Sequence, residues 1–112
     1  MDKSLLAGTT TVLILKLLEE KDMYGYEMIV SLTNRSNHTF DLKAGTLYPL
    51  LHGLERDGAV ESYEKTADNE RIRKYYHLTK VGKGILKAKE KEWYEYSNAV
   101  NGVLSGGLCY EG

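Results

Sequence analysis

Four leucines in the middle of the chain recur at the spacing of one face of an α-helix. The positions i, i+3, i+4 and i+7 are held by Leu47, Leu50, Leu51 and Leu54. This spacing places the four side chains along a single buried stripe. Gly58 follows where a helix commonly ends in a left-handed residue. The pattern predicts a helix over residues 44–57 that packs one face into a core and leaves the other face exposed.

Helical spacing and strand alternation predict the other elements along the chain. The expected helices cover residues 4–20, 25–34, 44–57 and 80–104, and the expected strands cover residues 40–42, 59–64 and 71–78. Thr79 is a suitable N-cap for the last helix. Short helices followed by a hairpin indicate an α+β fold that is mostly α, a winged helix-turn-helix with an additional long C-terminal dimerisation helix. We expect a domain over residues 1–79, the dimerisation helix over 80–105 and a flexible tail over 106–112.

Composition limits the classes of protein to which the chain can belong. The 112 residues are 42% apolar and 28% charged, which is typical of one globular domain. The formal net charge is -1, so support for nucleic-acid binding must come from local patches. A single cysteine, Cys109, and the absence of a signal-peptide pattern indicate a cytoplasmic protein. The longest apolar run, residues 12–15, is too short to span a membrane.

Catalytic, cofactor and metal signatures are not found in the sequence. The three histidines are scattered, one to each predicted element, without metal-ligand spacing. No glycine-rich phosphate loop or nucleophile motif is present. We therefore predict no catalytic residue, no metal and no cofactor, and an enzymatic role is the least favoured of the alternatives.

The predicted helix over residues 44–57 carries polar side chains opposite its leucine stripe. In a helix-turn-helix the second helix lies in the major groove of DNA, and its N-terminal half meets the base edges. The candidate contacts to phosphates and bases are Lys43, Thr46, Tyr48 and His52. The alternative is an ordinary solvated helix face.

A second group of candidates lies on the strand that returns from the predicted hairpin. Arg71, Arg73 and Lys74 follow a polar turn and form a cationic cluster. A basic wing can contact the DNA backbone beside the helix in the groove, since each neutralised phosphate releases counterions. The alternative is a solvated strand edge in which Asp68 and Glu70 pair with the arginines.

The last predicted helix has an apolar seam that the small domain cannot cover. The seam is formed by Trp93, Tyr96, Val100 and Val103 at spacings of three and four. We expect it, with Leu13 and Leu17 of the first helix, to form a homodimer interface. Trp93 and its symmetry mate could also line a flat site for an aromatic ligand. Both interpretations stay open, and they are compatible.

Four blocks of residues match a known family in order. Residues 45–49 read GTLYP, and Leu54-Glu55-Arg56-Asp57-Gly58 follows at the end of the same helix. Residues 23–27 read MYGYE, and residues 73–79 read RKYYHLT, with Gly82 three residues later. The chain resembles the PadR family over residues 6–93.

The resemblance implies a bacterial or archaeal regulator of transcription. Members of that family are mostly repressors that dimerise through the last helix and bind inverted repeats in promoters. The double-stranded DNA of such a promoter site would be the main partner of this chain. Some members release DNA when a phenolic or other small aromatic effector binds, and Trp93 falls where the smaller members stack a ligand. The rival hypothesis is a winged-helix module that binds another protein and not DNA.

Overall fold

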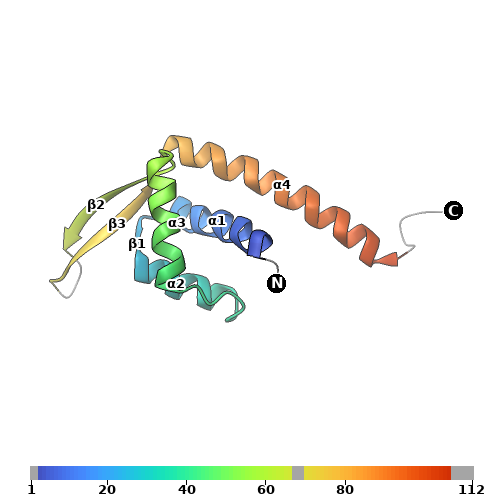
Figure 1. Cartoon of the computed structure of the whole chain (residues 1–112), viewed down its shortest axis with the longest axis horizontal. Coiled ribbons are helices and arrows are strands. Elements are labelled where there is room, and N and C mark those ends of the chain that lie inside the picture. The colour runs from blue at the N-terminus through green and yellow to red at the C-terminus, as the bar shows by residue number, and fades with distance from the viewer. Residues whose placement is uncertain (1–2, 67–69, 107–112) are drawn as a thin grey trace.

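The computed structural model describes residues 3–66 and 70–106, and for residues 3–7 only the backbone. Three helices lead into a hairpin and a long last helix. In chain order the elements are α1 (Lys3–Glu20), β1 (Met23–Tyr24), α2 (Gly25–Arg35), α3 (Ala44–Arg56), β2 (Val60–Thr66), β3 (Ile72–Leu78) and α4 (Lys80–Leu104) (Figure 1). The helices lie within one residue of the predicted bounds, and the mostly helical winged-helix fold is confirmed. Of the tail predicted over residues 106–112, only Gly106 is described; Cys109 and Asp68 lie outside the described residues.

The sheet contains three antiparallel strands in the order β1-β3-β2. The strand predicted over residues 40–42 is wrong, because those residues form an irregular connection before α3. The third strand is β1, which pairs Met23 with Tyr76 and Tyr24 with Tyr75. Alternating polarity at residues 40–42 reflects half-burial of Phe40 and Leu42 against the core and not pairing with another strand.

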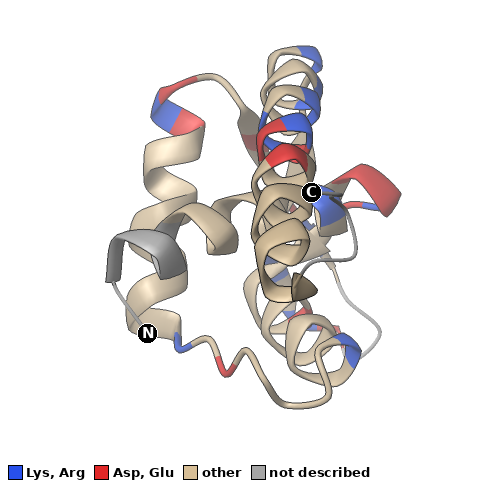
Figure 2. Cartoon of the chain, turned by 90° about the vertical axis from the view of Figure 1, so that its right-hand side faces the viewer, with Lys and Arg blue, Asp and Glu red and all other residues tan. Residues whose placement is uncertain are grey.

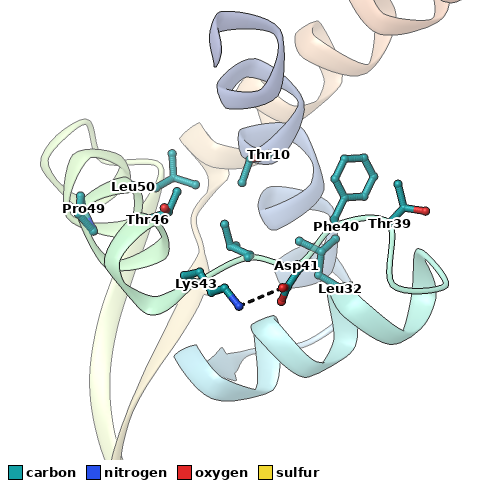
Figure 3. Close-up of a pocket in the computed structure, with 10 residues that line it drawn as sticks. Thr10, Leu32, Thr39, Phe40, Asp41, Lys43, Thr46, Pro49 and Leu50 are labelled. Atoms are coloured by element: carbon teal, nitrogen blue, oxygen red, sulfur yellow. Dashed lines mark hydrogen bonds and ion pairs between the residues drawn. The ribbon is translucent and has the colours of Figure 1, made fainter. Parts of the chain in front are cut away.

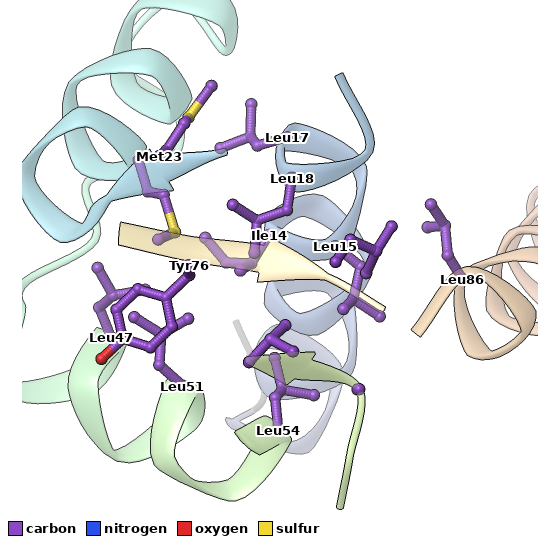
Figure 4. Close-up of a cluster of buried hydrophobic side chains, with 14 of the residues drawn as sticks. Ile14, Leu15, Leu17, Leu18, Met23, Leu47, Leu51, Leu54, Tyr76 and Leu86 are labelled. Carbon is purple, nitrogen blue, oxygen red and sulfur yellow. The ribbon is translucent and has the colours of Figure 1, made fainter. Parts of the chain in front are cut away.

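The core lies between the sheet and the three short helices. Tyr76 and Leu78 of β3 are buried in one cluster with Leu47, Leu51 and Leu54 of α3. Figure 4 shows Leu47 and Leu51 beside Tyr76. Tyr26 of α2 does not belong to this core, because its side chain is 63% exposed. The carboxylate of Glu27 accepts the backbone N–H of Tyr24, and this bond caps the start of α2.

A close junction joins the end of α3, the start of β2 and the start of α4. Gly58 has φ +80, the left-handed conformation that the C-cap prediction required. The N–H of Ala59 donates to the carbonyl of Leu54, and Thr79 donates from its hydroxyl to the carbonyl of Gly58. The Thr79 hydroxyl also accepts the N–H of Gly82, which confirms it as the N-cap of α4. The backbone of Gly82 therefore packs against the carbonyl of Ala59.

Helix α4 is attached to the domain by its first half. Leu86 is fully buried, and Glu90 lies 3.6 Å from the ammonium of Lys16 on α1. The second half extends away from the sheet, so that the molecule is 64 Å long (Figure 1). The aromatic residues of α4 lie in this extended part.

Candidate nucleic-acid interface

Helix α3 turns its leucines inward and its polar residues outward. Leu47 and Leu51 are fully buried, whereas Lys43, Thr46 and His52 are exposed. The N–H groups of Thr46 and Leu47 both donate to the carbonyl of Lys43, the N-cap residue. Like any helix start, this end of α3 has a positive dipole end that favours an anion.

Pro49 is the sixth residue of α3, beyond the first turn. At this position the backbone N–H of any other residue would be paired within the helix. Pro49 removes one helical hydrogen bond, and Gly45 stands four residues earlier, where the proline ring would contact the carbonyl. The fully buried Leu47 and Leu51 on either side hold this part of the helix in place.

Tyr48 has a packing role in addition to its exposed edge. Its side chain is 38% exposed, and its hydroxyl and ring lie directly over Gly25 at the start of α2. A Cβ at position 25 would collide with that ring, so Gly25 is required for the close approach of α2 and α3. The sequence blocks at residues 23–27 and 45–49 therefore pack against each other.

Lys43 forms an ion pair with Asp41 at 2.9 Å. Both side chains are largely exposed, with 74% and 66% of their surface accessible. Such surface pairs contribute little free energy. The ammonium of Lys43 can therefore exchange Asp41 for another anion at small cost.

The hairpin of β2 and β3 forms the wing, and its cations point to both sides of the sheet. Arg73 lies with its guanidinium 4.7 Å from the ring centre of Tyr24, and Lys74 lies 5.6 Å from that of Tyr76. Arg71 is exposed immediately before β3, beside the turn. Sequence reasoning missed Lys65, which lies 5.1 Å from the ring centre of Tyr75.

Three tyrosines form a ladder across the outer face of the sheet. Tyr24 meets Tyr75 edge to face at 5.4 Å, and Tyr75 stacks on Tyr63 at 5.8 Å. The strand register places these residues side by side. Alternation along β2 and β3 could predict which face of the sheet Tyr63 and Tyr75 occupy. The contact of Tyr24 with Tyr75 depends on the pairing of β1 with β3, which alternation does not predict. The Nε of Arg73 is buried at this end of the ladder without a hydrogen-bond partner among the described residues.

Replacing Tyr24 with leucine is expected to lower the free energy of unfolding by about 1–2 kcal/mol relative to Tyr24→Phe. Leucine removes the ring that contacts Tyr75 and Arg73, and aromatic and cation–π contacts each contribute about 0.5–1 kcal/mol at such a site. Phenylalanine keeps both ring contacts. Urea unfolding monitored by circular dichroism measures the difference, and equal stability of the two variants would show that the ladder contributes nothing.

Asp22, in the turn between α1 and β1, links to both strands of the wing. Its carboxylate accepts the hydroxyl of Tyr63 at 2.6 Å and lies 2.8 Å from Nδ1 of His77. Partial burial raises the pKa of Asp22, but the hydrogen bonds from Tyr63 and His77 outweigh it and hold that pKa below its usual 3.8. Donation to Asp22 raises the pKa of Tyr63 to about 12. We call these three residues the wing anchor.

Replacing Asp22 with asparagine is expected to lower the free energy of unfolding at pH 7 by about 1 kcal/mol, because a charged acceptor is lost at a partly exposed site. The pKa of Asp22 is lowered by folding, so its contribution is present above pH 4 and is lost as the pH falls through the folded pKa. The stability difference between wild type and variant should therefore shrink below pH 4. Urea unfolding at a series of pH values tests this, and a difference independent of pH would contradict it.

The residues predicted for the seam differ in their exposure. Trp93 and Tyr96 are 43% and 55% exposed, with ring centres 6.1 Å apart, and Val100 is half-buried. Leu17 is 2% exposed and belongs to the core of its own chain, so its side chain is not presented to a second subunit. Leu13 is half-buried against the same core. Sequence reasoning missed Tyr94, which is 60% exposed on the same helix.

Acidic and basic residues are interspersed over the face shown in Figure 2. Within residues 3–66 and 70–106, no three His, Cys, Asp or Glu side chains converge in a way that could hold a metal ion. In the same part of the chain, none of the helices has the length and apolar character needed to cross a bilayer.

Comparison with known proteins identifies the family. The model of the PadR-like family of transcriptional regulators matches residues 14–88. A protein from Lysinibacillus sphaericus is 35% identical over 102 residues, which are 91% of this chain and 94% of the relative. The structure of a PadR-like transcriptional regulator from Bacillus cereus is similar with a TM-score of 0.82 and 29% identity, covering 93% of this chain and 99% of that one.

A PadR family transcription regulator from Clostridium difficile is 36% identical with a TM-score of 0.71, covering 84% of this chain and 96% of that one. Because the members of the matched family are transcriptional regulators and not enzymes, the prediction of a non-enzymatic protein is confirmed. The family matched is the one that the four sequence blocks resemble. The chain belongs to the PadR-like family of transcriptional regulators.

Proposed function

We propose that this regulator binds double-stranded DNA as a homodimer, on an inverted repeat in a promoter, and acts as a repressor. The observation that carries the proposal is the exposed polar face of α3 next to a wing with four cations. Lys43, Thr46, Tyr48 and His52 would contact phosphates and base edges from α3. Arg71, Arg73, Lys74 and Lys65 would contact the backbone from the wing.

The exposed aromatic part of α4 supports the homodimer. Trp93, Tyr94 and Tyr96 present large apolar surfaces on a helix that extends away from the domain. Large rigid aromatic side chains are typical anchors of interfaces. Two copies joined along α4 would present two α3 helices to successive major grooves, about 34 Å apart.

A small aromatic effector bound against Trp93 would alter this spacing and lower the affinity for DNA. Trp93→Ala is expected to abolish the response to such an effector while sparing the dimer. Sedimentation of the variant reports the assembly state. Loss of the dimer together with the response would assign Trp93 to the interface alone.

Hydroxyl-radical footprinting on the DNA upstream of the protein's own coding sequence tests the binding mode. The proposal predicts two protected half-sites, related by a two-fold axis and separated by about one helical turn. A single protected segment without two-fold symmetry would contradict a homodimer on an inverted repeat. The rival function, a protein-binding module, predicts no footprint at any protein concentration.

A further inference from the structure

A pocket of about 720 Å³ lies beside α3, and the described residues that line it include none from α4. Its walls come from α1, α2, the connection that precedes α3, and α3 itself. Figure 3 shows Thr10 of α1 above the pocket, Thr46 and Leu50 of α3 on one side, and Leu32 and Phe40 on the other. Its volume lies in the range of sites for small molecules.

The lining indicates the chemistry of an occupant. The lining is mostly apolar, and its apolar residues include Leu32, Phe40, Leu42, Pro49 and Leu50. Threonine hydroxyls add hydrogen-bonding groups, and Thr10 is a buried polar residue. Among the described residues that line the pocket, only Asp41 and Lys43 are charged, and they form an ion pair at 2.9 Å. The net charge of the lining is therefore zero, which favours neither a cation nor an anion.

We propose that this pocket binds a neutral, amphipathic organic molecule with an apolar body and one or two hydrogen-bonding groups. The apolar body would lie against Leu32, Phe40 and Leu50, and its polar group would face the threonines. None of the lining residues belongs to α4, so the site is separate from any site at Trp93.

The position of the pocket gives it a regulatory consequence that rests on the proposed DNA binding. Lys43 and Thr46 line the pocket and are also proposed contacts to DNA. An occupant would bind these two side chains and hold α3 against the connection before it. It would therefore compete with DNA for Lys43 and Thr46. Because coupling between two binding sites is reciprocal, the occupant lowers the affinity for DNA and DNA lowers the affinity for the occupant.

The binding step is tested without DNA by titration with N-phenyl-1-naphthylamine, a neutral probe whose fluorescence rises in apolar surroundings. We expect saturable binding of one probe per chain, with a dissociation constant in the micromolar range for a molecule of this size. Leu42→Glu and Leu50→Gln each place a polar group in the lining and should weaken binding at least tenfold. Thermal melting shows which of these variants are folded.

Matched controls locate the probe. Leu42→Met keeps the apolar lining, and Val81→Glu adds the same charge at an exposed position on α4; both should bind like wild type. Trp93→Ala removes any probe bound at the proposed effector site on α4, so the binding that remains in this variant is the pocket's. Absence of saturable binding, or loss of binding in Trp93→Ala with both folded lining variants unaffected, would overturn the proposal.

A second titration separates the pocket from the function of DNA binding. In the presence of saturating probe, the dissociation constant for promoter DNA should rise, and the rise should disappear in Leu42→Glu. If the probe binds as described but the protein binds no DNA, the pocket stands and the proposed function fails. If DNA binds normally and the probe does not bind, the proposed function stands and the pocket proposal fails.

Discussion

Arg71→Glu is expected to weaken binding to promoter DNA about 100-fold at 0.1 M salt, because each protomer of the dimer loses a phosphate contact and gains a repulsive charge. Arg71 is exposed beside the turn of the wing, and in the proposed complex it would reach the DNA backbone next to the groove that holds α3. The slope of log Kd against log salt should fall by about two, one phosphate for each wing. Fluorescence anisotropy at four salt concentrations measures both quantities.

The matched control is Lys87→Glu, which makes the same charge change at an exposed position on α4. It should change the affinity by no more than about threefold, because the net charge of the protein acts only weakly at a distance in salt. Equal effects of the two variants would mean that the protein's overall charge, and not the wing, governs binding. Unchanged affinity in Arg71→Glu would remove Arg71 from the interface.

Gly82→Ala is expected to lower the free energy of unfolding by about 2–3 kcal/mol, the cost of overpacking a tight site. A Cβ at position 82 would collide with the backbone carbonyl of Ala59 and with the side chain of Leu78. The carbonyl cannot move aside easily, because it accepts the N–H of Thr79 at 3.1 Å and the Thr79 hydroxyl at 3.0 Å. Urea unfolding at one fixed protein concentration measures the change.

Gly84, two residues later on the same helix, is the control for Gly82. A Cβ at position 84 would meet nothing within 4 Å. Gly84→Ala should therefore raise the free energy of unfolding by about 0.5–1 kcal/mol through helix propensity alone. If both alanine variants are stabilised, the junction between α3, β2 and α4 does not require a glycine.

Local sequence patterns predicted most of the fold. The leucine stripe of α3, Gly58 at its end and Thr79 at the start of α4 each depend on residues within one or two turns, so their signals are local. The helix bounds followed from those signals. The family resemblance rested on the same residues and on the wing sequence, and the family match confirmed it.

Contacts between distant residues were not predictable in this way. Strand β1 has only two residues, and its pairing with β3 joins positions more than fifty residues apart. The tyrosine ladder and the wing anchor both depend on that pairing. The residues near Asp22 and Tyr63 in the sequence therefore do not predict that these two side chains meet. Leu17 follows Leu13 by four residues, a helical spacing that suits an interface and a core equally well. Only the packing of α1 shows that Leu17 faces the core of its own chain.

The proposed function requires that the chain recognise DNA through both phosphates and bases. The measurement is a fluorescence-anisotropy titration of the wild-type protein with its own promoter duplex, beside a scrambled duplex of equal length, at several salt concentrations. We expect the promoter to bind at least about a thousandfold more tightly than the scrambled DNA, with affinity that falls steeply as salt rises. Equally weak binding of both duplexes at every salt concentration would contradict the account.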